Sequence, residues 1–184
     1  MRKTINCFIP YEENTAIDKV VTALKDSIVV NKIYLLTTAH GSMPSVPAGC
    51  EPFTIDSLNS SDTIKKIAQK ADTPFTLLYT KASPFELGYM ALERIADFLQ
   101  DRKTGMVYAD HYEWKEGEKK KHPAIDYQPG SVRDDFDFGA LLAFRSEYLI
   151  GAAGMMENER ENYRYAGCLL YTSPSPRDMR RSRM

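Results

Sequence analysis

The chain has 184 residues, of which 43% are hydrophobic and 27% charged, and its formal net charge is −1 at pH 7. This composition predicts a globular protein of one domain. No apolar run approaches the length that crosses a bilayer, and the first residues lack a signal-peptide pattern. We therefore expect a cytoplasmic protein, or in the alternative one that is peripheral to the inner face of the membrane. Three scattered cysteines predict buried, reduced thiols.

The first forty residues alternate strand and helix patterns. Residues 4–9 are apolar and β-rich, and this run stops at Pro10. A helix capped by Asn14 or Thr15 is expected next, because apolar residues recur at helical spacing: Ile17, Val20, Val21, Leu24 and Ile28. Residues 32–38 predict a second strand. A strand–helix–strand unit of this kind gives a parallel pair of strands.

The chain is organised around a short apolar run, residues 75–79, bounded by Pro74 and by Thr80. Such a run predicts a strand buried on both faces, as in the middle of a parallel sheet. Before it, residues 53–55 predict a short strand, and Ser60 or Ser61 is expected to cap a helix. After it, Pro84 stands where a helix could begin, and that helix is marked by Leu87, Met90, Ala91, Ile95, Phe98 and Leu99.

The second half continues the alternation. Residues 106–109 predict a strand that leads to Asp110 and His111, and Glu116-Gly117 predicts a hairpin turn. An apolar strand is expected over 138–144, after which Ser146 is expected to cap a short helix. Together these patterns predict an α/β fold, a three-layer sandwich with a mostly parallel central sheet.

The last stretch, residues 168–184, differs from everything before it. It carries four arginines and shows no periodicity. The string CLLYTSPSPRDMRRSRM resembles a translated sequencing adapter. We predict one domain over 1–167 and a non-native or disordered tail over 168–184. Without the tail the net charge is about −4, which leaves no basic cluster besides Lys119–Lys121, so no nucleic-acid partner is expected.

Polar residues follow the predicted strands at the edge where a ligand of an open α/β sheet binds. Hydroxyls, backbone amides, one lysine and carboxylates suit a nucleotide and its phosphates, whereas the glycine patterns of dinucleotide and P-loop sites are absent from the sequence. The predicted donor-binding residues are Pro10, Tyr11, Glu12, Thr38, Asp56, Thr80 and Lys81.

Two segments carry a resemblance to a known family. The opening INCFIPYEEN is similar to the first strand of the family-2 glycosyltransferases, and FGALLAFR resembles their later strand before the acceptor-side acid. The resemblance covers residues 3–167. It implies the GT-A fold and inverting transfer of a sugar from a nucleotide-sugar donor to a saccharide or lipid-linked acceptor, as in polysaccharide biosynthesis.

The chain departs from that family at two places. Family members end the central strand with a DxD carboxylate pair that holds a divalent metal, Mg²⁺ or Mn²⁺, where this chain has Tyr79-Thr80-Lys81. Lys81 could neutralise the phosphates instead, or Asp110 and His111 could bind the metal. The general base is expected beyond Gly167, so we expect this fragment to be inactive.

The acidic stretch 126–137 is expected on the acceptor side, where Arg133, Asp135 and Asp137 would contact hydroxyls or form an ion pair. Tyr112 and Trp114 are interpreted as hairpin packing, with a sugar platform as the alternative. Two other functions stay open. One is a nucleotidyltransferase, which normally has a glycine-rich basic loop after the first strand. The other is a non-catalytic module that binds a nucleotide or sugar.

Overall fold

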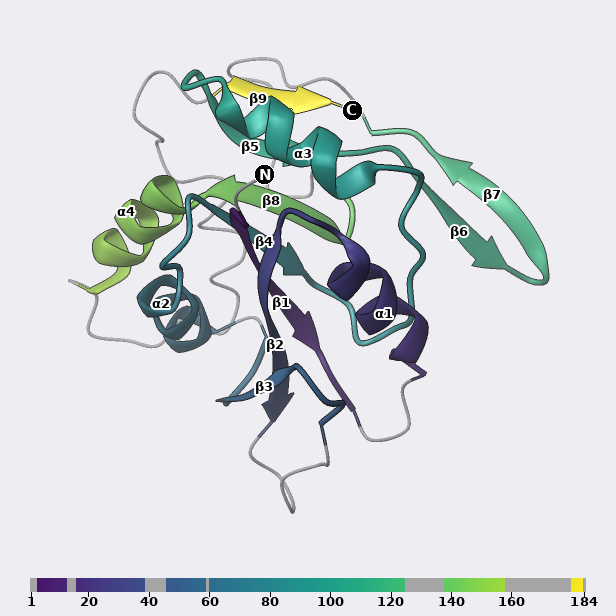
Figure 1. Ribbon diagram of the computed structural model, residues 1–184, viewed down its shortest axis with the longest axis horizontal. Helices are drawn as coiled ribbons and strands as arrows, with labels where there is room; N and C mark the ends of the chain where they lie inside the picture. The colour runs from purple at the N-terminus through teal and green to yellow at the C-terminus, as the bar shows by residue number, and fades with distance from the viewer. Residues whose placement is uncertain are drawn as a thin grey trace.

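The computed structural model describes residues 3–12, 16–38, 46–58, 60–124, 138–157 and 180–183. Helices separate β1 from β2, β3 from β4 and β4 from β5, whereas β3 follows β2 with no helix between them among the described residues (Figure 1). The elements are β1 (Ile5–Pro10), α1 (Asp18–Asp26), β2 (Val30–Thr38), β3 (Glu51–Ile55), α2 (Ser61–Gln69), β4 (Phe75–Tyr79), α3 (Ala91–Gln100), β5 (Thr104–Tyr108), β6 (His111–Lys115), β7 (Glu118–His122), β8 (Leu141–Arg145), α4 (Ser146–Glu157) and β9 (Arg180–Arg183).

The main sheet has seven strands in the order β3-β2-β1-β4-β8-β5-β9. Strands β1 to β4 are mutually parallel, and β8 is antiparallel to both of its neighbours, β4 and β5. Strand β5 therefore runs in the same direction as β4. The predicted mostly parallel sheet is confirmed, with β8 as the reversed strand. Strands β6 and β7 form a separate antiparallel hairpin that projects from the sheet (Figure 1).

Two apolar clusters cover the two faces of the sheet. One joins alternate β1 residues such as Cys7 and Ile9 to α1 and α3, through Leu24 and Leu99 among others. The other joins Phe8 to α2 and α4. This alternation follows from the two-residue period of a strand, which directs successive side chains to opposite faces. The three layers predicted from the sequence are therefore confirmed: helices, sheet, helices.

Strand β4 is buried along its whole length, as its unbroken apolar run predicts. It pairs in parallel with β1 and antiparallel with β8. At its amino end the Phe75 amide donates to the Thr4 carbonyl over 3.0 Å, and the Ser146 amide donates to the Pro74 carbonyl over 2.9 Å. Strand β4 thus lies between two neighbours that are far apart in the sequence, β1 and β8.

The starts of two helices differ from their predicted positions. The N-cap of α1 is Ile17, which gives no side-chain hydrogen bond, whereas Asn14 and Thr15 lie outside the described residues. Helix α3 begins at Ala91, well after Pro84, because Met90 has a left-handed φ of 50°. The intervening segment packs by its rings instead: Phe85 lies 4.2 Å from Tyr79 between centroids. The cap of α2 is confirmed as Ser60, whose hydroxyl accepts from the Thr63 amide over 3.2 Å.

Two cysteines fall within the described residues, and both are free thiols. Cys7 lies in β1 and is fully buried, and burial raises the pKa of its thiol. Cys50 is half-buried, and burial also raises its thiol pKa. The predicted burial is confirmed for Cys7 alone, and Cys168 lies outside the described residues.

Strand β9 pairs in parallel with β5 at the edge of the sheet (Figure 1). Residues 168–179 and 184 lie outside the described residues, so the tail assignment of 168–184 stays a prediction. None of the helices in the described part of the chain combines the length and apolar character needed to span a bilayer.

Candidate functional site

Five strands end at one edge of the sheet, because β1 to β4 are parallel and β5 runs with β4. In an open α/β sheet this carboxyl edge is where ligands bind. The topology places the segments after β1, β3, β4 and β5 there, with Tyr11, Glu12, Asp56, Thr80 and Asp110. The loops expected to meet at one edge therefore do so wherever they are described.

The end of β1 is anchored to β2. Pro10 is the last, buried residue of β1, and the Tyr11 amide donates to the Leu36 carbonyl over 2.8 Å. Tyr11 packs partly buried against the apolar cluster, whereas Glu12 is exposed. The Glu12 carboxylate is thus carried on a fixed strand end and reaches solvent at the edge.

The ends of β2 and β3 present exposed polar side chains at the same edge. Thr38 is the last residue of β2, and Asp56 directly follows β3. Both are exposed, in contrast to the buried residues that precede them, Thr37 and Ile55. A ligand at this edge could reach both side chains without any rearrangement of the sheet.

Thr80 and Lys81 connect β4 to two other segments. The Thr80 amide and hydroxyl both donate to the Ala140 carbonyl, over 2.9 Å and 3.3 Å. Lys81 instead extends to the hairpin, where its Nζ donates to Glu113 Oε1 over 3.2 Å. The side chain of Lys81 is half exposed, at 51%. The lysine that follows the central strand is therefore paired with a carboxylate in this state.

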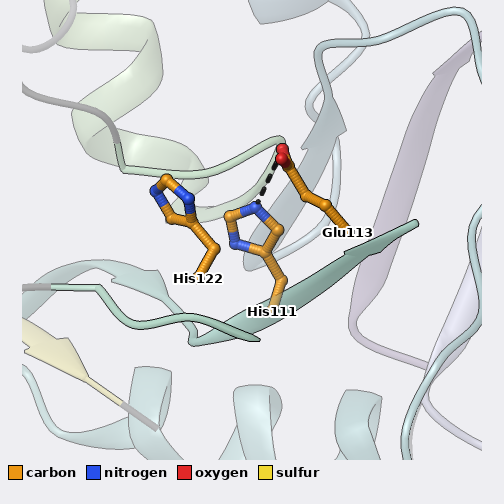
Figure 2. Close-up of side chains that lie close together, drawn as sticks. All are labelled: His111, Glu113 and His122. Carbon is orange, nitrogen blue, oxygen red and sulfur yellow. Dashed lines mark ion pairs between the residues drawn. The ribbon is translucent and has the colours of Figure 1, made fainter. Parts of the chain in front are cut away.

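The hairpin gathers three metal-ligating side chains on one face, which we call the His-Glu-His cluster: His111, Glu113 and His122. His111 and His122 are opposite each other in the β6–β7 register, with stacked rings 4.7 Å apart. Glu113 follows His111 by two residues, and its Oε1 lies 3.5 Å from His111 Nε2 (Figure 2). One ligand atom from each of the three residues lies within 4.8 Å of the others.

Lysines surround the carboxylate of the cluster. Lys115 Nζ lies 2.7 Å from Glu113 Oε2, and Lys81 approaches Oε1. The hydrogen bonds from Lys115 and then from Lys81 lower the pKa of Glu113 to about 2. The same carboxylate raises the pKa of Lys115. Glu113 is therefore ionised at neutral pH and is a ready anionic ligand.

Asp110 closes the base of the hairpin. Its Oδ1 accepts a hydrogen bond from the Ala124 amide over 2.8 Å, and its Oδ2 lies 3.9 Å from Lys121 Nζ. Asp110 and His111 were predicted together as metal ligands. The structure groups His111 with Glu113 and His122, and this group does not contain Asp110.

Sequence reasoning did not find Glu113 and His122. The signal was nevertheless present, because a turn centred on Glu116-Gly117 pairs residue 111 with residue 122, and residues 111 and 113 share a face by strand period. The opposite face carries Tyr112 and Trp114, which are 58% and 73% exposed. The Tyr112 ring packs within the hairpin, where Lys119 Nζ lies 4.6 Å from its centroid, and the sugar platform stays a prediction. The predicted acceptor residues Arg133, Asp135 and Asp137 lie outside the described residues.

No protein-family model and no curated protein matches the amino-acid sequence. Solved structures do match the fold. A 2-C-methyl-D-erythritol 4-phosphate cytidylyltransferase from Thermus thermophilus aligns with TM-score 0.54 and 11% identity, over 98% of this chain and 89% of that one. A 4-diphosphocytidyl-2C-methyl-D-erythritol synthase from Anaerococcus prevotii aligns with TM-score 0.56 and 8% identity, over 98% and 87%.

A glucosyl-3-phosphoglycerate synthase from Mycobacterium tuberculosis, in complex with UDP, aligns with TM-score 0.52 and 9% identity. The match covers 79% of this chain and 58% of the synthase, so this chain spans little more than half of that protein. Another structure of the synthase, with Mn²⁺, UDP and phosphoglyceric acid, aligns with TM-score 0.50. The chain thus has the fold that nucleotidyltransferases and glycosyltransferases of nucleotide sugars share.

Proposed function

We propose that the protein is the donor-binding part of a glycosyltransferase that takes a sugar from a nucleotide-sugar donor. The observation that carries this proposal is the carboxyl edge of the sheet. Five strand ends converge there with exposed carboxylates and hydroxyls and with Lys81. The UDP complex of the similarly folded synthase supports a nucleoside diphosphate as the ligand.

Each edge residue has a proposed role. Tyr11, Glu12, Thr38 and Asp56 would contact the base and ribose, because they follow the first strands of the sheet. Thr80 and Lys81 would meet the diphosphate, with Lys81 as a cationic partner at the position after β4. For this, Lys81 must exchange its half-exposed ion pair with Glu113 for a phosphate. Pairs of this kind contribute little to stability, so the exchange costs little.

The acceptor chemistry rests on the family resemblance. An acceptor hydroxyl, on a saccharide or a lipid-linked saccharide, would attack the anomeric carbon with inversion, and the nucleoside diphosphate would leave. That step needs a proton acceptor, which we place beyond Gly167. Arg133, Asp135 and Asp137 remain the proposed acceptor-side residues. The chain described here would then bind a donor without transferring its sugar.

One observation favours a nucleotidyltransferase as the second candidate. The cytidylyltransferase folds align over nearly the whole of both chains, whereas the glucosyl synthase match covers 58% of that protein. A nucleotidyltransferase attacks the α-phosphate and usually carries a glycine-rich, basic loop after β1. This chain has Tyr11 and two glutamates after Pro10. We therefore rank the glycosyltransferase first.

Binding and product analysis test the proposal. The Kd of UDP and CTP nucleotides and of UDP-sugars is measured by calorimetry, with and without Mn²⁺. Lys81→Ala should raise the Kd of a UDP-sugar about tenfold, because one charge-assisted hydrogen bond is lost. Lys103→Ala is the matched control, since Lys103 precedes β5 at the opposite edge. A Kd that responds equally to both changes contradicts the proposed donor site.

The reaction distinguishes the two enzyme classes. A longer form of the protein that contains the expected base should release UDP from a UDP-sugar in the presence of an acceptor. Release of pyrophosphate from CTP or UTP with a sugar phosphate would instead establish the nucleotidyltransferase. Tight nucleotide binding with neither product would favour the binding module.

A further inference from the structure

The two histidines of the His-Glu-His cluster face each other because of the hairpin register. His111 begins β6 and His122 ends β7, so they form the last cross-strand pair before the hairpin joins the sheet. Glu113 lies on the same face, since it follows His111 by one full strand period. Figure 2 shows the three side chains turned toward one another. The backbone therefore holds three ligand-bearing residues of two types in one place.

We propose that this cluster is a transition-metal site of the Zn²⁺ class, with His111, Glu113 and His122 as its protein ligands. The site goes beyond the proposed donor binding and does not depend on it. Ligand atoms of a tetrahedral metal at about 2.1 Å lie about 3.4 Å apart. His111 Nε2 and Glu113 Oε1 are already 3.5 Å apart, and all three ligand atoms lie within 4.8 Å. Small side-chain rotations close the remaining gap.

The imidazole of His111 provides an independent observation. Both of its nitrogens are shielded from solvent, and neither has a hydrogen-bond partner within the part of the chain that the structure describes. Buried polar atoms are almost always satisfied, so an orphaned pair calls for a missing partner. On one side the ring lies against Gly139, where a Cβ would come within 3.2 Å of Nδ1. Nε2 faces Glu113, and a metal bound between them would satisfy it.

The ligand set selects the metal. Two imidazoles and one carboxylate suit Zn²⁺, Co²⁺, Ni²⁺ or Cu²⁺, whereas Mg²⁺ and Ca²⁺ prefer oxygen ligands. The charge of the surroundings supports the same choice. Lys81 and Lys115 contact Glu113, and Lys120 is opposite it in the register. A hard cation held by charge alone would be repelled there, but imidazole nitrogens bind softer metals by donation.

Metal binding would change the partners of Glu113. The side chains of Lys81 and Lys115 are 51% and 62% exposed, so both can turn into solvent when the carboxylate binds a metal. Three protein ligands leave a fourth position open, as in catalytic zinc sites. The release of Lys81 would free it for the donor phosphates. That consequence rests on the proposed function, whereas the metal site itself does not.

Co²⁺ is the probe, because it takes the place of Zn²⁺ and absorbs visible light when bound to nitrogen ligands. The metal-free chain of 184 residues is titrated with Co²⁺, and both the absorption and the quenching of Trp114, the single tryptophan, are recorded. We expect one equivalent of Co²⁺ to bind and Zn²⁺ to displace it, while excess Mg²⁺ does not. Binding that Mg²⁺ reverses, or no binding at all, overturns the proposal.

Substitutions assign the ligands. His122→Gln and Glu113→Gln should each raise the Co²⁺ Kd by at least about tenfold, since the loss of even a supporting residue costs that much at metal sites. His40→Gln is the matched control, because His40 is the one histidine of the sequence that does not belong to the cluster. Far-UV circular dichroism confirms that the variants fold. A Co²⁺ Kd that changes with His40→Gln and not with His122→Gln contradicts the assignment.

The two proposals can fail separately. A chain that binds Co²⁺ at the hairpin but no nucleotide refutes the donor site and leaves the metal site intact. A chain that binds a UDP-sugar but no Co²⁺ refutes the metal site and leaves the donor site intact.

Discussion

Asn6 is a buried amide in the middle of the sheet, where a hydrophobic residue would be expected. Its side chain is 0% exposed. Its Nδ2 donates to the Lys70 carbonyl over 3.1 Å and to Asp72 Oδ1 over 2.6 Å, and its Oδ1 accepts from Asn31 Nδ2 over 3.0 Å. One residue of β1 thus fixes both the start of β2 and the loop between α2 and β4.

We predict that Asn6→Ala lowers the free energy of unfolding by about 2–4 kcal/mol. The substitution removes three hydrogen bonds worth about 1 kcal/mol each and leaves a small cavity. Urea unfolding followed by far-UV circular dichroism measures the change. Asn31→Ala is the control, since it removes one of the three bonds and should cost about 1 kcal/mol. Equal losses in the two variants would contradict the central role of Asn6.

Some site residues could be predicted and others could not, for a physical reason. The positions of Lys81 and Asp56 beyond strand ends could be predicted, because position after a strand follows from local pattern alone. That Lys81 pairs with Glu113, 32 residues away in sequence, is a tertiary contact that no local pattern contains. The hydrogen bond that Asp110 accepts from the Ala124 amide is likewise a contact that no local pattern contains.

At the scale of elements, the β6–β7 hairpin has a strained turn. Glu116 and Gly117 both have positive φ, 55° and 82°, which is the geometry of a two-residue type I′ turn. Glycine adopts it freely, but glutamate does not. Asparagine is the preferred residue at the first position of such turns.

We therefore predict that Glu116→Asn stabilises the hairpin by about 0.5–1 kcal/mol, part of the cost of a left-handed residue. Native-state hydrogen exchange of the β6 and β7 amides measures the effect locally. Glu116→Ala is the matched control, because it removes the same charge without any preference for positive φ. Protection that rises as much in the alanine variant would show that charge, not backbone strain, determines hairpin stability.

Elements with an unbroken local pattern were predicted well. The bounds of β4 agree with the sequence because every one of its residues is apolar or buried. The start of α3 was missed because Leu87 and Met90 continue a helical spacing without being helical. The left-handed Met90 and the contact of Phe85 with Tyr79 end that continuation. Apolar spacing shows which residues face a core, but a loop can present them as well as a helix can.

At the scale of the whole molecule, β8 joins distant parts of the chain. It lies between β4 and β5, although residues 141–145 come long after both in sequence. Its middle residues, Leu142, Ala143 and Phe144, are buried. A strand was expected here from its apolar run. Its reversed direction and its place in the sheet could not be predicted from a local pattern, because they depend on how the strands pack with one another in the folded sheet.

This insertion predicts how the chain responds to truncation. A chain that ends at residue 137 lacks β8 and α4, so β4 and β5 lose their shared partner and Leu77, Leu78 and Met106 lose buried neighbours. We expect it to lose cooperative urea unfolding and to bind a hydrophobic dye, as loosely packed states do. A chain that ends at Gly167 keeps β8 and α4 and lacks only β9 among the described elements.

The chain that ends at Gly167 is the matched control and should unfold in one cooperative transition, with a loss limited to the edge hydrogen bonds of β9, each worth about 1 kcal/mol. Such a result would support a domain over 1–167, because the pairing of β9 with β5 would then add only an edge strand to a complete core. A chain ending at Gly167 that fails to fold would make residues 168–184 part of the domain. Cooperative folding of the shorter chain would mean that β4 and β5 need no strand between them.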